Sequence, residues 1–206
     1  MHNHRGDNYN FFLVILTLFV IFAGYYSIRG TITGLPIGIP TNITSCSVIN
    51  TSGDYFLQND VAGNGSAVCF NITASDVYLD CMGYFADNGS VLLNSFKTNF
   101  TLANCIINFS NFPAVEIDRS YNVTLFNLNF SKTSPDWFGV NSIRIWESKN
   151  VNISNINLTN QNAESIEILS SDNIFVDNLY STQDYGNHIR VYSSGDHFNI
   201  IIIDSI

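Results

Sequence analysis

The sequence predicts an all-β fold, a right-handed parallel β-helix built as a single-stranded solenoid, and three observations support this prediction. Short segments of alternating apolar and polar residues recur about every 23 residues along the chain. Asparagine fills 28 of the 206 positions, and charged residues make up only 12% of the chain. Strands that recur once per coil stack in parallel on their counterparts one coil later, about 4.8 Å apart. The right hand follows from the usual crossover preference.

Residues 11–28 form an uncharged, strongly apolar run that is just long enough for a helix that crosses a membrane. Arg5 precedes the run, so residues 1–10 are expected to form a cytoplasmic tail. The candidate cleavage points lack a small residue three positions upstream, which favours an uncleaved signal anchor over a cleaved signal peptide. In both cases the rest of the chain is exported. Residues 29–45 are then a linker and cap, and residues 46–206 the β-helix.

Two sets of apolar anchor residues define the repeat. Both sets recur at a nearly constant spacing of about 23 residues, and both show one longer spacing at the same place in the chain. Each anchor lies in a segment with period-two alternation, which indicates a strand, and the density of Asn, Ser and Thr argues against helices. The first set is Val68, Val91, Val115, Ile143, Ile166 and Ile189, and the second is Val77, Phe100, Val123, Val151, Ile174 and Phe198.

The asparagine excess has a position in this repeat. Four of the six residues that lie four places after a second-set anchor are asparagine, and apolar strand residues continue beyond them. We therefore expect a bend at this position, with amides that hydrogen-bond from coil to coil as an asparagine ladder. The six positions are Cys81, Asn104, Asn127, Asn155, Asn178 and Ile202.

The four cysteines follow the same spacing. Cys46 lies one repeat before Cys69, and Cys81 lies one repeat and one further position before Cys105. Residues one coil apart have Cα atoms near 5 Å, which is within reach of a disulfide, and export makes oxidation possible. We expect both bridges, and no metal site or cofactor, because the chain has no Cys-x-x-Cys pattern.

The segments around these cysteines resemble a known group of proteins. Cys46, residues 53–57 (GDYFL), residues 69–72 (CFNI) and residues 75–83 (SDVYLDCMG) are similar to the opening of secreted prokaryotic, above all archaeal, β-helix proteins of the pectin-lyase-like superfamily with NosD-like repeats. The resemblance covers roughly residues 44–206. It implies an exported, surface-associated protein that contacts polysaccharide, in a group that includes lyases, hydrolases, epimerases, adhesins and spacers.

The resemblance also directs attention to acidic residues. Lyases of this fold use clustered acids with calcium and a basic residue, and polygalacturonases use three aspartates with a histidine loop. Neither set is present, and His188 only begins a strand. The outward row of the first-set strands reads Cys69, Leu92, Glu116, Arg144, Glu167 and Arg190.

Glu116 and Glu167 are the only carboxylate pair retained as catalytic candidates. Two coil steps place them about 9.6 Å apart, near the upper limit for an inverting glycosidase. Arg144 lies between them and would keep both ionised. A structural ladder of alternating charge is therefore the favoured interpretation, with Glu116, Glu167 and Arg144 as weak catalytic candidates.

A row two positions farther along the same strands becomes aromatic in the later coils. It reads Asn94, Asp118, Trp146, Leu169 and Tyr192, and the insertion at 131–141 adds Trp137. Aromatic faces beside charged groups suit sugar rings. The predicted ligand-binding residues are Trp137, Trp146, Tyr192, Arg144 and Arg190. The alternative is that the insertion folds over Trp146 as a local apolar cluster.

The net charge, the glycosylation sequons and the last apolar segment give three further expectations about partners and modification. A net charge of −9 and a pI near 4.5 exclude nucleic acid and anionic membrane surfaces as partners. Eleven Asn-x-Ser/Thr sequons occur, with Asn64 and Asn88 the most credible acceptors. Residues 198–203 end the chain in an uncapped apolar strand, which predicts a fragment or an end-to-end contact with another chain.

The leading functional hypothesis is an extracellular or cell-surface β-helix, secreted or membrane-anchored through 11–28, that presents a non-catalytic carbohydrate-binding or adhesive face. A polysaccharide lyase or glycoside hydrolase is the alternative from another class. A passive stalk is the third.

Overall fold

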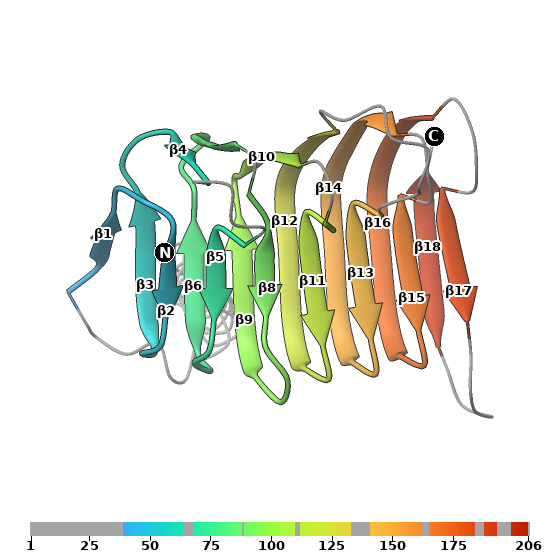
Figure 1. The fold of residues 1–206 in the computed structure, drawn as a ribbon. Coiled ribbons are helices and arrows are strands. Elements are labelled where there is room, and N and C mark those ends of the chain that lie inside the picture. Colours follow the sequence, from blue (N-terminus) through green and yellow to red (C-terminus); the bar gives the residue numbers. More distant parts are fainter. Residues whose placement is uncertain are drawn as a thin grey trace, which may run out of the picture. The chain divides into compact units, whose positions relative to one another are not determined.

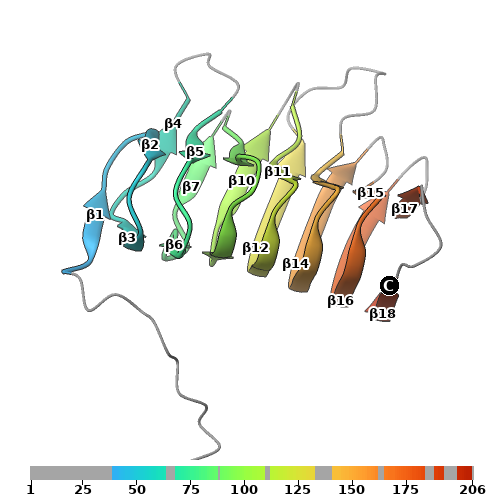
Figure 2. The ribbon, with the colours of Figure 1, turned by 90° about the horizontal axis from the view of Figure 1, so that it is seen from below.

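The computed structural model describes residues 39–63, 68–87, 89–109, 112–132, 141–161, 165–183, 188–192 and 199–205. These residues form a solenoid of parallel strands, in which strands pair with their counterparts in the neighbouring coil (Figure 1). Seen from below, the strands of successive coils line up in two walls that enclose the interior (Figure 2). The predicted parallel β-solenoid, with one coil for each repeat of the sequence, is therefore confirmed.

The first wall is a seven-stranded sheet, called the first sheet below. It carries one short strand from each coil, in the order β17-β15-β13-β11-β8-β5-β2. Its strands are β2 (Ser47–Ile49), β5 (Phe70–Ile72), β8 (Val91–Leu93), β11 (Val115–Asp118), β13 (Ile143–Trp146), β15 (Ile166–Leu169) and β17 (Ile189–Tyr192).

The second wall is an eleven-stranded sheet, called the second sheet. Its strands are β1 (Thr41–Ile43), β3 (Gly53–Leu57), β4 (Val61–Ala62), β6 (Val77–Asp80), β7 (Phe85–Asp87), β9 (Thr98–Ala103), β10 (Ile106–Phe109), β12 (Tyr121–Lys132), β14 (Lys149–Gln161), β16 (Asp172–Gln183) and β18 (Ile200–Ser205). The first half of β12 pairs with β9 and its second half with β10. The coils of β12, β14 and β16 therefore each contribute one long, bent strand to the second sheet, whereas the coil before β12 contributes two shorter strands in its place, β9 and β10.

The predicted register was wrong by two residues in two places. Phe70, and not Val68, pairs with Val91, so Asn71 rather than Cys69 lies opposite Leu92. In the last coil Ile200 takes the place expected for Phe198 and pairs with Ile174. A slip of two residues keeps every side chain on the same face of a strand, so the alternation of apolar and polar residues cannot detect it.

Apolar side chains stack in columns inside the solenoid. One column of the second sheet has no exposed surface at all, and each member pairs with the next. Its members are Leu79, Leu102, Leu125, Ile153 and Val176. Each repeat places an aliphatic side chain at the same position, so aliphatic side chains pack on one another from coil to coil. This continuous core supplies most of the stability of a solenoid.

Buried serines stack beside these apolar columns. The backbone N–H of Ser120 donates to the Ser148 hydroxyl, and that of Ser148 donates to the Ser171 hydroxyl, both at 3.0 Å. Each hydroxyl also donates within its own turn, for example from Ser148 to the carbonyl of Trp146. These buried hydroxyls are therefore paired, which removes the cost of burying them.

The predicted asparagine ladder lies at the bends of the second sheet. Asn127 donates to Asn104 at 2.7 Å, and Asn178 donates to Asn155 at 2.6 Å. Asn104 donates in turn to both carboxylate oxygens of Asp80 at 3.0 Å. The four asparagines have φ between 51° and 54°, a left-handed conformation that asparagine tolerates better than most residues.

A second ladder lies at the residue before each of the first five second-set anchors, a position for which no ladder was predicted from the sequence. Its five members have φ between 53° and 56°, and each of its four asparagine amides donates to the member in the preceding coil at 2.6–3.2 Å. They are Asp76, Asn99, Asn122, Asn150 and Asn173.

Both predicted disulfides are present. Cys46 bonds Cys69 and Cys81 bonds Cys105, with Cα atoms 4.5 Å and 4.8 Å apart. Each bridge joins two successive coils near the amino-terminal end of the described residues. Two disulfides indicate a non-reducing compartment.

Gly89 fits closely against the first of these bridges. A Cβ added at Gly89 would lie 2.6 Å from the Cβ of Cys69. Replacing Gly89 by alanine is expected to lower the free energy of unfolding by about 1–2 kcal/mol, because neither Cβ can move without its backbone. Urea unfolding measures this. Gly83→Ala measures a different cost, that of a left-handed backbone alone, because its Cβ would meet no atom within 4 Å while its φ of 85° disfavours alanine. A Gly89→Ala protein as stable as the parent contradicts the prediction.

Tyr78 links stability to alkaline pH. Its hydroxyl donates to Asp80 at 3.0 Å. Partial burial and this acidic partner raise the pKa of Tyr78 to about 12, whereas tyrosine in an unfolded chain titrates near 10. Unfolding therefore releases a proton in this range, and the free energy of unfolding is expected to fall between about pH 10 and pH 12. The Tyr78→Phe variant should show a shallower alkaline decline in urea unfolding. An equal decline in both proteins would contradict the assignment.

The amino-terminal predictions fall outside the described residues. These include the tail at 1–10 and the apolar helix at 11–28, both of which stay predictions. The first paired strand, β1, begins at Thr41, within the segment expected to be linker and cap. In the part of the chain that the structure describes, no helix is long and apolar enough to span a membrane.

Candidate functional site

A row of alternating charge runs across the outer face of the first sheet, as the repeat predicts. Glu116, Arg144, Glu167 and Arg190 lie directly opposite one another on β11, β13, β15 and β17. Arg144 lies 3.7 Å from Glu116 (Nη1 to Oε1) and 3.5 Å from Glu167 (Nε to Oε2). Opposite charges on directly paired strands stabilise a parallel stack modestly where they remain partly exposed.

Glu167 has a second partner. The amide of Asn141 donates to its Oε2 at 2.6 Å. Arg144 therefore occupies the space between the two carboxylates, and Glu167 also accepts a hydrogen bond from Asn141. This arrangement is that of a structural charge ladder, and it leaves no open gap in which Glu116 and Glu167 could flank a sugar bond as acid and base.

An aromatic side chain lies beside the charge row. Trp146 ends β13, where it pairs with Asp118 on one side and Leu169 on the other, and it is 39% exposed. The guanidinium carbon of Arg144 lies 5.7 Å from the centre of its ring, and that of Arg119 lies 5.8 Å away. Both distances are in the range of cation–π attraction.

Arg119 connects Trp146 to a second exposed ring. Its guanidinium carbon lies 5.4 Å from the centre of the Phe96 ring, which is 67% exposed. Asp118 accepts two hydrogen bonds from the same guanidinium, at 3.0 Å from Nε and 3.1 Å from Nη2. Arg119 is thus held in a fixed plane between two aromatic side chains.

The carboxylate of Asp118 stays ionised in this setting. Burial by itself would raise the pKa of Asp118. Hydrogen bonds from Arg119 and from the Ser95 hydroxyl outweigh it, together with the positive charges of Arg119 and Arg144, and they lower the pKa below its ordinary value. The two hydrogen bonds between Asp118 and Arg119 therefore persist at neutral and mildly acidic pH.

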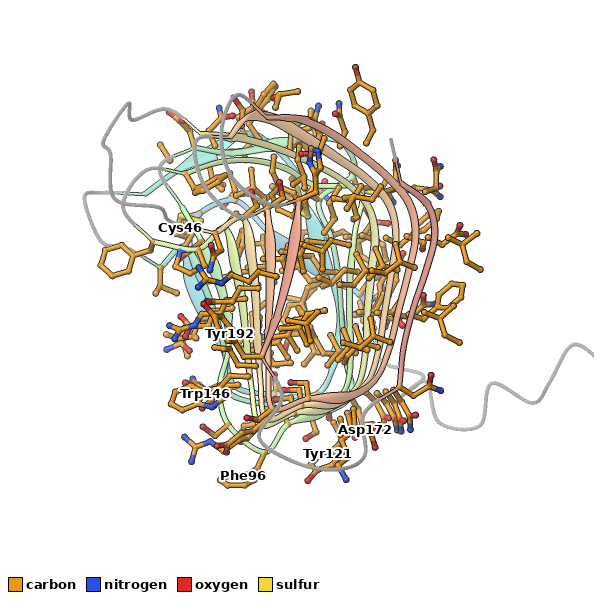
Figure 3. All side chains as sticks on the ribbon, turned by 90° about the vertical axis from the view of Figure 1, so that its right-hand side faces the viewer. Cys46, Phe96, Tyr121, Trp146, Asp172 and Tyr192 are labelled. Atoms are coloured by element: carbon orange, nitrogen blue, oxygen red, sulfur yellow. A yellow bond between two sulfur atoms is a disulfide. The ribbon has the colours of Figure 1, made fainter. Side chains whose placement is uncertain are left out.

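Tyr192 extends the aromatic row toward the last coil. It pairs with Leu169, which pairs with Trp146, so the two rings lie two strand steps apart, about 9.6 Å. The guanidinium carbon of Arg190 lies 4.5 Å from the centre of the Tyr192 ring, which is 40% exposed. Figure 3 shows Trp146 and Tyr192 on the outer side of the first sheet and Phe96 at the adjoining turn.

Together these residues form the aromatic–arginine face. It consists of Phe96, Arg119, Arg144, Trp146, Arg190 and Tyr192. The sequence predicted four of the six. Phe96 and Arg119 were missed because the repeat has no common residue type at their position. Each lies four residues before a second-set anchor, at a turn with positive φ (63° and 43°).

Other predicted elements of the site have different outcomes. Trp137 lies in the insertion at 133–140, outside the described residues, so its part in the face stays a prediction. In the described ranges no group of three or more His, Cys, Asp or Glu side chains is arranged to hold a metal ion.

Comparison with protein-family models, with curated proteins and with solved structures found no match to this chain.

Proposed function

We propose that the chain is an exported, cell-surface β-helix of the pectin-lyase-like kind that binds carbohydrate through the aromatic–arginine face without cleaving it. The observation that carries the proposal is the pair of exposed rings, Trp146 and Tyr192, held beside guanidinium groups on a rigid sheet. Sugar rings bind by stacking an apolar face on an aromatic side chain, while their hydroxyls bond to neighbouring polar groups. The two disulfides are consistent with an oxidising exterior.

The position of Arg144 supports binding over catalysis. It forms ion pairs with both candidate carboxylates, Glu116 and Glu167, and fills the space between them, where a sugar bond and a water would have to lie. If the chain is a hydrolase or lyase instead, new reducing or unsaturated ends will appear in a panel of polysaccharides. Their loss in Glu116→Gln and Glu167→Gln would assign the chemistry to these carboxylates.

Replacing Trp146 by alanine tests the binding face. We expect retention on insoluble polysaccharides to fall about tenfold or more, the equivalent of about 1.4 kcal/mol, because the stacking surface is removed. Phe126→Ala is the matched control, since Phe126 is an aromatic residue of the second sheet with similar exposure, 41% against 39%. Pull-down on a polysaccharide panel measures retention. Equal retention by Trp146→Ala and Phe126→Ala would overturn the aromatic–arginine face as the binding site, and no retention of the parent protein would overturn polysaccharide binding through this face.

A further inference from the structure

A concave site lies on the second sheet, at its bends and away from the aromatic–arginine face. It is a hollow of about 340 Å³, called the amide groove below. The residues around it come from the turns after β6 and β9 and from β10, β12 and β14. They are Gly83, Asn104, Cys105, Ile106, Asn127, Leu128, Asn129, Asn155 and Asn157.

Two columns of side chains form the walls of the amide groove. One wall is the asparagine ladder at the bends, which contributes Asn104, Asn127 and Asn155. The other wall is the column two residues farther along each strand, where Ile106 pairs with Asn129 and Asn129 pairs with Asn157. The groove therefore runs along the solenoid axis and crosses several coils.

Exposed aromatic side chains continue the second wall in both directions. Phe85 pairs with Ile106 at one end and is 40% exposed, and Tyr180 pairs with Asn157 at the other end and is 50% exposed. Four strand steps separate them, which is about 19 Å. A ligand that fills the groove would thus find a ring at each end and amides between.

The groove has hydrogen-bonding capacity that the fold itself does not use. The Oδ1 atom of Asn157 is buried and has no hydrogen-bond partner among the described residues. A buried acceptor left without a donor costs free energy, which a bound hydroxyl would recover once the amide turns toward it. The ladder amide of Asn127 gives one of its two N–H groups to Asn104, and the other remains for a ligand.

The chemistry of the lining limits the class of ligand. None of the nine residues that line the groove is charged, and the chain carries a net charge of −9, so an anionic polymer gains no cation here and is repelled. An extended peptide pairs through its backbone with an open sheet edge, whereas the backbone here is already paired on both sides in β12 and β14. A chain of uncharged sugars carries hydroxyls along its length and apolar ring faces.

We propose that the amide groove is a second binding site, which takes an uncharged linear oligosaccharide lying along the solenoid axis. Amides of Asn127, Asn129 and Asn157 bond to the sugar hydroxyls, and the rings of Phe85 and Tyr180 stack on sugars at the two ends. The site belongs to the second sheet and does not require the aromatic–arginine face of the first sheet.

The test is a calorimetric titration with linear hexasaccharides of cellulose, xylan, mannan and laminarin. Asn129 and Asn157 both begin Asn-x-Ser/Thr sequons, so the protein should come from a bacterial periplasm without N-glycosylation, where the disulfides also form. We expect at least one hexasaccharide to bind, and to bind at least tenfold more tightly than its disaccharide. Absence of binding by all four overturns the proposal.

Variants assign the binding to the groove. Asn157→Leu keeps the size of the side chain and removes its hydrogen bonds, and it should weaken hexasaccharide binding about tenfold. Asn152→Leu is the matched control, an exposed asparagine on the other arm of the same strand and outside the groove, and it should bind as the parent does. Tyr180→Ala, at a half-exposed position that tolerates truncation, should weaken binding severalfold even if Asn157→Leu folds poorly.

Two outcomes contradict the assignment. Loss of binding in Trp146→Ala with full binding in Asn157→Leu and Tyr180→Ala would place the oligosaccharide on the aromatic–arginine face and overturn the groove. Binding of an extended, uncharged peptide in place of the oligosaccharides, lost in the same groove variants, would overturn the ligand class. Failure of polysaccharide retention in the separate Trp146 experiment leaves the groove titration unaffected.

Discussion

Replacing Phe130 by alanine is expected to lower the free energy of unfolding by about 3–5 kcal/mol. Phe130 lies in β12 with no exposed surface, and it pairs with Ile107 of one neighbouring coil and Leu158 of the other. Truncation removes the contacts of a whole ring and leaves a cavity between two coils. Because each coil of a solenoid packs only on its neighbours, no distant segment can move in to fill it.

Urea unfolding of Phe130→Ala measures the loss, and Phe126→Ala is its control. Phe126 lies four residues earlier in the same strand but is 41% exposed, so its truncation should cost less than about 1 kcal/mol. Similar losses in the two variants would mean that the column containing Phe130 is not the tightly packed interior described above.

Asn150 gives the second large effect. Its amide donates to Asn122 at 3.0 Å and accepts from Asn173 at 3.1 Å, and its φ is 56°. Asn150→Ala removes both hydrogen bonds and forces alanine into a left-handed conformation, so the free energy of unfolding should fall by about 2–3 kcal/mol. Urea unfolding of the purified variant measures the change.

Two further variants separate the causes at Asn150. Asn150→Gly accepts the positive φ and loses only the amide bonds, so it should recover about 1 kcal/mol relative to alanine. Asn152→Ala, an exposed residue two positions along the same strand that does not have a positive φ, should change stability by no more than about 0.5 kcal/mol. If Asn150→Ala and Asn152→Ala are equally stable, the ladder contributes nothing measurable.

The parallel β-solenoid could be predicted from the sequence because apolar strand segments recur at a constant spacing, and a single arrangement, stacked coils, buries all of them. The bend ladder followed because Asn104, Asn127, Asn155 and Asn178 fall at the same place in the repeat, and the structure gives all four nearly the same φ. The charge row followed in the same way. What failed was the register at Phe70 and Ile200, where coils differ in length and a two-residue slip leaves the apolar pattern unchanged.

The candidate site could be predicted only where its residues lie on strands. Trp146 and Tyr192 follow from the register of the first sheet, because side chains alternate between faces. Phe96 and Arg119 occupy a turn whose counterparts in the next coils are Glu147 and Ser170, so the column shares a positive φ but no side-chain chemistry. Because the residues of this turn differ in type from coil to coil and share only a backbone conformation, the sequence repeat does not mark the turn as part of a site.

The alternation of Glu116, Arg144, Glu167 and Arg190 restricts how this solenoid can change in length. Gain or loss of a single coil within the row would bring two glutamates or two arginines face to face on neighbouring strands, where like charges repel. Gain or loss of two coils at once would preserve the order of signs. The unit of duplication that this face tolerates is therefore a pair of coils, twice the unit on which the fold itself is built.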